Sequence, residues 1–304
     1  MSSTLIRRIL LLVHPQRPEA IEVAVEVVHR LRTEGIELVI PEGEAHSDRL
    51  LQEGVLVAGD PSHPAAGCEL VVILGGDGTI LRGAELARGS GVPLLGFNLG
   101  HVGFLAEIER DDIGRTVEHI LARQWVVDER MALEVVVSAG DREVFRSWAL
   151  NEVSIEKAAR ERMIELAVGI DGRPLSTWGC DGLVMATPTG STAYAFSAGG
   201  PIVWPDVEAL LVVPISAHAL FARPVVVGPS SQLTVEVLPH TDGSAVVWCD
   251  GRRATDVPPG SRIEVVRSAE PVRLARFTTL PFADRLVRKL DLPVHGWRGP
   301  RTAR

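Results

Sequence analysis

The chain contains few cysteines, few aromatic residues and no long hydrophobic run. Three cysteines (Cys68, Cys180 and Cys249) show no metal-ligand spacing and cannot all pair, which excludes a disulfide scaffold and predicts reduced thiols. Aromatic residues make up 5% of 304 residues, and Tyr194 is the single tyrosine. The apolar stretch at residues 9–13 is too short for a signal peptide or a membrane span. We therefore expect a cytoplasmic protein that does not bind membranes.

Positive charge is also scarce. Lysine and arginine number 31 against 39 acidic residues, a net charge of −8, which argues against a nucleic-acid surface. The chain has no G-x-x-x-x-G-K-[ST] sequence, so any phosphate site works without a P-loop lysine. The length and a hydrophobic content of 46% are typical of a globular protein of about two domains.

The most informative stretch is residues 70–79. Residues 70–74 are continuously apolar, which predicts a parallel strand buried on both faces, and Gly-Gly-Asp-Gly-Thr follows directly. The glycines allow backbone N–H groups to approach a ligand, and Thr79 is predicted to cap a helix over residues 80–87. Asp77 is then placed at the carboxyl end of a central strand, where α/β sheets bind ligands. A simple tight turn is the alternative interpretation.

The pattern of elements predicts two domains and a returning tail. Alternating strands and helices over residues 1–128 predict a Rossmann-like α/β domain with a parallel sheet. Residues 129–280 contain closely spaced strands with hairpin turns at 138–141, 171–172 and 250–251, which predict an all-β, sandwich-like domain. Residues 281–304 include an amphipathic segment at 282–290, predicted to be a helix that packs back on the first domain.

Four further polar clusters are candidates for chemistry. Asn151 and Glu152 follow a predicted strand, and Asp181 precedes a glycine. Residues 187–201 crowd hydroxyl groups around glycines and one aromatic ring, and thus offer hydrogen-bond donors and a stacking face. Each cluster also has a structural interpretation: a polar strand end, a turn, or a hydroxyl-stabilised turn that leads into a helix. Asp250 with Gly251 is most simply a hairpin turn.

Taken together and in order, these motifs resemble those of the NAD kinase family. The match comprises residues 75–79, 98–105, 151–152, 181–182 and 187–197, and the chain looks most similar to actinobacterial members. Gly-Gly-Asp-Gly alone is shared with lipid and sugar kinases, whereas its combination with Thr-Pro-Thr-Gly-Ser-Thr-Ala-Tyr is highly specific. A lipid or sugar kinase, and a non-catalytic module that senses NAD(P), are the alternative functions.

The resemblance implies ATP-dependent phosphorylation of the adenosine ribose 2′-hydroxyl of NAD, giving NADP. It implies that Asp77 is the proton acceptor and that Gly78 lies against the same ligand. It also implies Mg²⁺ and a homodimer or homotetramer, with no protein residue assigned as a metal ligand; whether polyphosphate replaces ATP stays open. The residues implied to contact NAD are Asn151, Glu152, Asp181, Thr192, Ala193, Tyr194, Ala195, Phe196 and Ser197.

Elementary chemistry agrees with these implied roles. Phosphoryl transfer requires mainly positioning and charge stabilisation, so one carboxylate that orients a hydroxyl is sufficient side-chain chemistry. Arg82 lies one helical turn beyond Thr79, where it either contacts phosphate or is an exposed helix arginine. Arg162 belongs to a basic patch that begins at Lys157, and we expect it to contact a diphosphate unless the patch is simply solvated.

Overall fold

The computed structural model describes most of the chain and divides it into two compact units. The first unit comprises residues 1–129 and 272–304, and the second comprises residues 130–271. The described residues are 6–44, 47–98, 103–106, 108–109, 113–159, 162–240, 243–277 and 281–294. In this part of the chain no helix has the length and apolar composition needed to cross a membrane.

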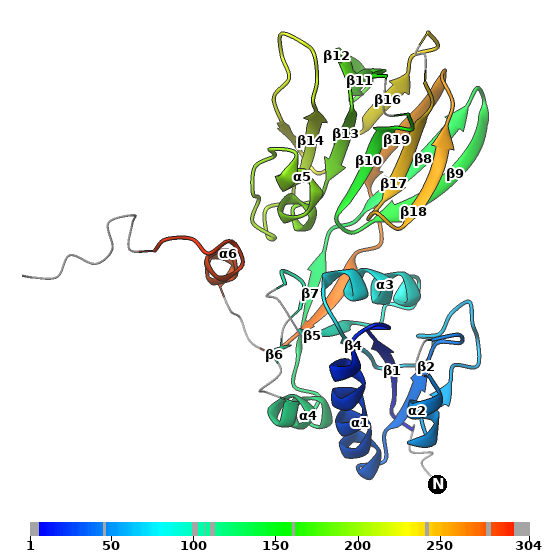
Figure 1. Cartoon of the computed structure of the whole chain (residues 1–304), viewed down its shortest axis with the longest axis vertical. Helices are drawn as coiled ribbons and strands as arrows, with labels where there is room; N and C mark the ends of the chain where they lie inside the picture. The colour runs from blue at the N-terminus through cyan, green and yellow to red at the C-terminus, as the bar shows by residue number, and fades with distance from the viewer. Residues whose placement is uncertain are drawn as a thin grey trace, which may run out of the picture. The chain divides into compact units, whose positions relative to one another are not determined.

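The first unit is built on a largely parallel sheet (Figure 1). Its strand order is β3-β2-β1-β4-β5-β20-β7, with β6 beside β5. β4 occupies the centre and all five of its residues are buried, as the continuous apolar run predicts. The strands are β1 (Arg8–Val13), β2 (Glu37–Ile40), β3 (Leu56–Val57), β4 (Leu70–Leu74), β5 (Leu94–Asn98), β6 (Ile108–Glu109), β7 (Val126–Arg130) and β20 (Val272–Arg276).

Helices cover both faces of this sheet. Alternate residues of β1 and β4, such as Ile9 and Val72, share one buried cluster with apolar residues of α1 (Pro18–Thr33) and α4 (Ile113–Leu121). α3 (Asp77–Ala87) packs on the opposite face, where the side chain of Ile73 lies against Gly83. The remaining helices of this unit are α2 (Ser47–Gln52) and α6 (Phe282–Leu290). The expected α/β architecture is confirmed.

The second unit consists of two antiparallel sheets. One has the order β15-β14-β13-β10-β17-β18 and the other β12-β11-β16-β19-β8-β9. Their strands are β8 (Leu133–Ala139), β9 (Arg142–Ala149), β10 (Glu152–Lys157), β11 (Ile164–Ile170), β12 (Arg173–Cys180), β13 (Gly182–Ala186), β14 (Leu210–Ile215), β15 (Val225–Val227), β16 (Leu233–Val237), β17 (Ala245–Cys249), β18 (Arg253–Val257) and β19 (Ser261–Arg267).

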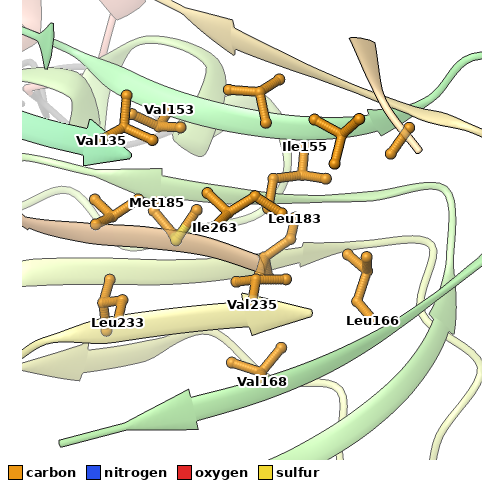
Figure 2. Packing of buried hydrophobic residues seen from close by; sticks show 14 of the residues in the cluster. Val135, Val153, Ile155, Leu166, Val168, Leu183, Met185, Leu233, Val235 and Ile263 are labelled. Atoms are coloured by element: carbon orange, nitrogen blue, oxygen red, sulfur yellow. The ribbon is translucent and has the colours of Figure 1, made fainter. Parts of the chain in front are cut away.

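Both sheets contribute alternate residues to one core. Figure 2 shows Val153, Ile155 and Met185 of one sheet on the same interior as Leu166, Val235 and Ile263 of the other. This arrangement confirms the expected all-β, sandwich-like domain. On the outer face of β13 and β14, a smaller cluster includes Ala195 of α5 (Tyr194–Ser197). The short helix η2 (Thr189–Thr192) precedes α5.

Details of the boundaries differ from the sequence expectations. α3 begins at Asp77 with Gly76 as its N-cap, so Thr79 lies inside the first turn and is not the cap. Residues 272–276 form β20, which pairs in parallel with β5 and belongs to the first unit, although the sequence analysis placed them in the second domain. α6 lies in the first unit, where the rings of Phe104 and Phe282 are 6.0 Å apart.

Candidate active site

The Gly-Gly-Asp-Gly-Thr turn connects β4 to α3 at the carboxyl edge of the parallel sheet. Gly75 is required by the chain itself, because a Cβ there would lie 2.7 Å from the Cβ of Thr79. At Gly76 and Gly78, in contrast, a Cβ would meet nothing within 4 Å among the described atoms. Packing therefore does not explain these two glycines, and they leave open space beside the N-terminus of α3. A helix N-terminus with exposed N–H groups favours anions.

The carboxylate of Asp77 is held by backbone amides of a nearby loop. The N–H of Phe104 donates to Oδ2 at 3.0 Å and the N–H of Leu105 donates to Oδ1 at 3.2 Å. A Cβ on Gly103 would overlap Oδ1 of Asp77, so only glycine permits this close approach. Two amides fix the orientation of the carboxylate and leave further oxygen lone pairs to accept a proton. Residues 99–102 of the motif at 98–105 lie outside the described residues.

Two arginines from the end of the chain hold the same loop. Arg276 of β20 donates to the carbonyl of Leu105 at 3.0 Å. Arg285 of α6 donates to the carbonyls of Phe104 and Ala106 at 3.2 and 3.3 Å. This arrangement could not be predicted from the sequence, because backbone carbonyls leave no signature in it. The last described elements of the chain thus fix the loop that holds Asp77.

Arg82 follows Asp77 by five residues on α3 and is not simply an exposed helix arginine. Its guanidinium forms an ion pair with Glu44, with Nη2 and Oε1 2.6 Å apart. Glu44 is buried, and this burial raises the pKa of its carboxyl, while the charge of Arg82 opposes the increase. Asp77, Gly78 and Arg82 therefore all lie on α3, and Arg82 has an acidic partner, Glu44, that no pattern in the sequence distinguishes.

In the second unit, Asn151 and Glu152 lie where β9 passes into β10. Both residues are buried, with 8% of each exposed. The carboxylate of Asp250 accepts hydrogen bonds from three successive N–H groups, those of Leu150, Asn151 and Glu152. The sequence analysis found Asp250 only as a turn residue. It is a turn residue, with a φ of 54°, and its buried carboxylate also accepts hydrogen bonds from this backbone.

The acidity of Glu152 is strongly altered by its surroundings. Burial raises the pKa of its carboxyl to about 8, and the negative charge of Asp250 adds to the increase. A hydrogen bond from the N–H of Tyr194 acts in the opposite direction. Among the described residues, Oε2 of Glu152 has no hydrogen-bond partner. At neutral pH Glu152 therefore carries a proton and has an unused polar atom, as expected of a ligand-binding residue.

The hydroxyl-rich segment divides into a structural part and an exposed part. Thr187 Oγ1 donates to the carbonyl of Leu150 at 2.6 Å, and Ser191 Oγ donates to the carbonyl of Pro188 at 2.7 Å. These hydroxyls bind the protein's own backbone. In the following residues, Thr192 Oγ1 donates to the carbonyl of Thr189, while Ala193 separates η2 from α5. The segment is thereby fixed against the Asn151 backbone.

The four residues of α5 have different surroundings. Ala195 is buried in the outer cluster, whereas the rings of Tyr194 and Phe196 are about 40% exposed and Ser197 is also exposed. Burial on one side raises the pKa of the Tyr194 hydroxyl, and the charges of Glu156 and Glu152 add to this effect. The aromatic faces of α5 are thus available for stacking close to Glu152.

The remaining predicted residues lie elsewhere in the second unit. Asp181 connects β12 to β13 and pairs with Lys157, whose Nζ is 2.5 Å from Oδ1. This hydrogen-bonded cation lowers the pKa of the Asp181 carboxyl. Arg162 is exposed two residues before β11. In the described part of the chain, no group of three or more His, Cys, Asp or Glu side chains is placed to hold a metal ion.

Comparison with known proteins identifies the family. Residues 9–125 match the model of the ATP-NAD kinase N-terminal domain, and residues 150–277 match that of the ATP-NAD kinase C-terminal domain. The chain is 55% identical over 299 residues to NAD kinase 2 of Streptomyces coelicolor, a match that covers 98% of this chain and 99% of that one. The chain belongs to the NAD kinase family.

Other relatives and solved structures agree with this assignment. The NAD kinase of Leifsonia xyli is 56% identical over 297 residues, which cover 97% of each chain. A crystal structure of an NAD kinase from Archaeoglobus fulgidus in complex with ATP has a TM-score of 0.70 at 25% identity and covers 94% of this chain and 99% of that one. Yeast NADH kinase complexed with NADH shares the fold, with a TM-score of 0.85 at 24% identity over 99% of this chain and 91% of that chain.

The family assignment confirms the resemblance drawn from the motifs, including the likeness to actinobacterial members. The chain is not merely one of the lipid or sugar kinases that share Gly-Gly-Asp-Gly. As an NAD kinase family member it is an enzyme of the phosphotransferase class.

Proposed function

We propose that this protein transfers the terminal phosphoryl group of ATP to the 2′-hydroxyl of the adenosine ribose of NAD, giving NADP and ADP, with Asp77 as proton acceptor. The observation that carries the proposal is the oriented Asp77 carboxylate on the first turn of α3, beside glycines that packing does not require. As the new ribose oxygen–phosphorus bond forms and the bond to ADP breaks, the hydroxyl proton passes to Asp77.

The second unit supplies the proposed NAD site. A protonated Glu152 carboxyl can donate one hydrogen bond and accept another, and the Asn151 amide can do both as well. The partly exposed ring of Tyr194 offers a stacking face to an adenine base, with Thr192, Ala193, Ala195, Phe196 and Ser197 shaping its surroundings. Asp181, held by Lys157, is proposed to lie near the nicotinamide half, and Arg162 is proposed to contact the diphosphate.

ATP is proposed to bind through the backbone amides at Gly78 and through Arg82, whose charge is oriented by Glu44. Mg²⁺ is proposed to be held largely by nucleotide phosphates and water, the usual way in which this ion binds in kinases. Such an ion would supply neutralisation of phosphate charge. It would also offset the negative charge of this acidic protein.

The test is an end-point assay with purified protein, NAD, ATP and Mg²⁺, in which NADP is detected by an NADP-specific dehydrogenase. We expect NADP to form, and Asp77→Asn to lower kcat by about 10²- to 10⁴-fold, as is usual for removal of a positioned acid or base. Glu85→Gln, an acidic position on the same helix, is the matched control. Near-normal turnover of a folded Asp77→Asn variant would refute the role of Asp77.

Binding of NAD without any NADP would instead indicate a sensing module. The same assay with polyphosphate in place of ATP, and with NADH in place of NAD, defines the donor and the acceptor. We also propose a cytoplasmic location and a homodimer or homotetramer, following the family resemblance. The three buried, unpaired cysteines agree with a reducing compartment, and light scattering of the purified protein measures the oligomer.

A further inference from the structure

Asp250 occupies the bend between β17 and β18, and its carboxylate is directed into the protein. Its backbone has a φ of 54° and that of Gly251 has a φ of 63°, and these two residues begin the three-residue connection between the paired residues Cys249 and Arg253. A carboxylate in such a turn commonly faces water. Here only 2% of the side chain is exposed. The turn alone does not explain why an acid is buried at this position.

The carboxylate is the hub of a backbone network. Oδ1 accepts the N–H of Asn151 at 2.7 Å and that of Glu152 at 3.3 Å, and Oδ2 accepts the N–H of Leu150 at 2.9 Å. The N–H of Asp250 donates in return to the carbonyl of Glu152 at 3.0 Å. Three consecutive amides are therefore fixed by one side chain, which determines the direction in which the Asn151 and Glu152 side chains leave the backbone.

Arg253 completes the network from the other side. Its Nη2 lies 3.0 Å from Oδ2 of Asp250 and donates to the carbonyl of Trp148 at 2.9 Å, and its guanidinium stacks 4.5 Å from the centre of the Trp148 ring. A planar guanidinium that both donates these hydrogen bonds and stacks on an aromatic ring cannot be replaced by a lysine without loss of geometry. The position of Asp250 is thus itself determined by the end of β9.

The chain contains a natural comparison in a second Asp-Gly hairpin. Asp171 and Gly172 join β11 and β12 with φ values of 53° and 73°. The Asp171 carboxylate accepts one backbone N–H, that of Gln232 at 2.8 Å, and the hydroxyl of Ser231 at 3.2 Å, all in an exposed setting. The turn chemistry is the same, whereas burial and the contact with the Asn151–Glu152 backbone belong to Asp250 alone of the two.

We infer that Asp250 is a positioning residue for NAD recognition: its carboxylate, held by Arg253, fixes the backbone of residues 150–152 and so aims Asn151 and Glu152 at the nucleotide. The inference rests on the proposed function, because it takes Asn151 and Glu152 as NAD ligands. Asp250 itself does not need to touch NAD. Substitution of Asp250 should therefore change the affinity for NAD and leave the affinity for ATP, which is proposed to bind in the first unit, unchanged.

The test compares Asp250→Asn with Asp171→Asn in steady-state kinetics with NAD and ATP varied separately. Asparagine keeps the size of the side chain but replaces one acceptor oxygen with a donor that opposes the amides. We expect KM for NAD to rise by roughly 10- to 100-fold, the range for loss of a charge-assisted hydrogen bond. KM for ATP, and kcat at saturating NAD, should stay within about threefold, and Asp171→Asn should resemble the wild type.

A fall in kcat together with a rise in KM for both NAD and ATP would mean that Asp250 is only a structural residue. An unchanged KM for NAD would also overturn the inference. If Asp250→Asn does not fold by circular dichroism, Arg253→Lys provides the same test, with a smaller but still NAD-selective rise expected. Asn151→Ala separates the two levels of the argument. If Asn151→Ala leaves NAD binding unchanged in calorimetry, the proposed NAD site is wrong. If Asn151→Ala weakens NAD binding but Asp250→Asn does not change KM for NAD, only the positioning role of Asp250 is wrong.

Discussion

Substitution of Glu152 by glutamine should make the second unit more stable, and increasingly so as the pH rises. The Glu152 carboxyl is buried beside Asp250, and one of its oxygens has no partner among the described residues. Burial, with the charge of Asp250, raises its pKa to about 8 from an ordinary value of 4.5. Glutamine has nearly the same shape and, like the protonated carboxyl, donates and accepts hydrogen bonds without a charge.

The sign and size of the effect follow from proton linkage. Between pH 4.5 and about 8 the folded state holds a proton on Glu152 that the unfolded state has lost, so the free energy of unfolding of the wild type falls as the pH rises. The full interval is worth roughly 5 kcal/mol, because each pKa unit corresponds to about 1.4 kcal/mol. Between pH 5.5 and 8.5, the stability advantage of Glu152→Gln should widen by about 3 kcal/mol.

Urea unfolding at these two pH values measures the difference. Four of the six tryptophans, including the fully buried Trp178, belong to the second unit, so tryptophan fluorescence reports mainly on the unit that contains Glu152. Glu264→Gln removes a partly exposed carboxyl of β19 that pairs with Arg262, and serves as the control. A stability difference between Glu152→Gln and the wild type that is the same at both pH values would refute the argument that Glu152 is protonated in the folded protein.

Two further predictions concern the loop that holds Asp77. Gly103→Ala places a methyl group on the Asp77 carboxylate and should lower kcat by about 10²-fold, as misplacement of a catalytic group by about 1 Å does; full turnover of the alanine variant would show that the carboxylate moves away from residue 103 before catalysis. Arg285→Met removes the hydrogen bonds to the carbonyls of Phe104 and Ala106 and should lower kcat several-fold, whereas Arg288→Met on the same helix should not. Equal effects of the two arginine variants would contradict a specific role of Arg285.

Much of the first unit can be predicted from the sequence because its central strands are continuous apolar runs. β1 and β4 are recognisable from composition alone, and α1 follows from its apolar period and its N-terminal proline. β20 could not be found in this way. Its sequence, Val-Arg-Leu-Ala-Arg, contains two arginines, and its partner β5 lies far away in the chain. Pairing across such a sequence separation leaves no local signal.

In the candidate site, too, features with a local sequence pattern could be predicted, and contacts between distant segments could not. Asp77 was predicted at the end of a buried strand, and the structure places it there, because strand, glycine turn and helix are consecutive in the sequence. The amides of Phe104 and Leu105 that hold its carboxylate could not be predicted, since every residue except proline carries such a group. Glu44 was missed because one acid in a loop rich in proline, glycine and acidic residues has no distinguishing pattern.

Asp250 and Glu152 raise a question of energetics that a fold alone does not answer. Two carboxyl groups lie buried near one another with Arg253 as the cation paired with Asp250, and burial raises the pKa of both. Replacement of a buried ionic group by neutral residues of similar shape is often neutral or stabilising, so such a pair is poorly explained by stability. The hydrogen bonds of Asp250 all end on the segment that carries Asn151 and Glu152 or on Arg253, which braces the strand before it. A local cost in stability is expected where a short segment must hold a fixed geometry for a ligand. For this reason, two substitutions in the same segment of the second unit should have different effects: Glu152→Gln should raise the free energy of unfolding, and Asp250→Asn should raise KM for NAD.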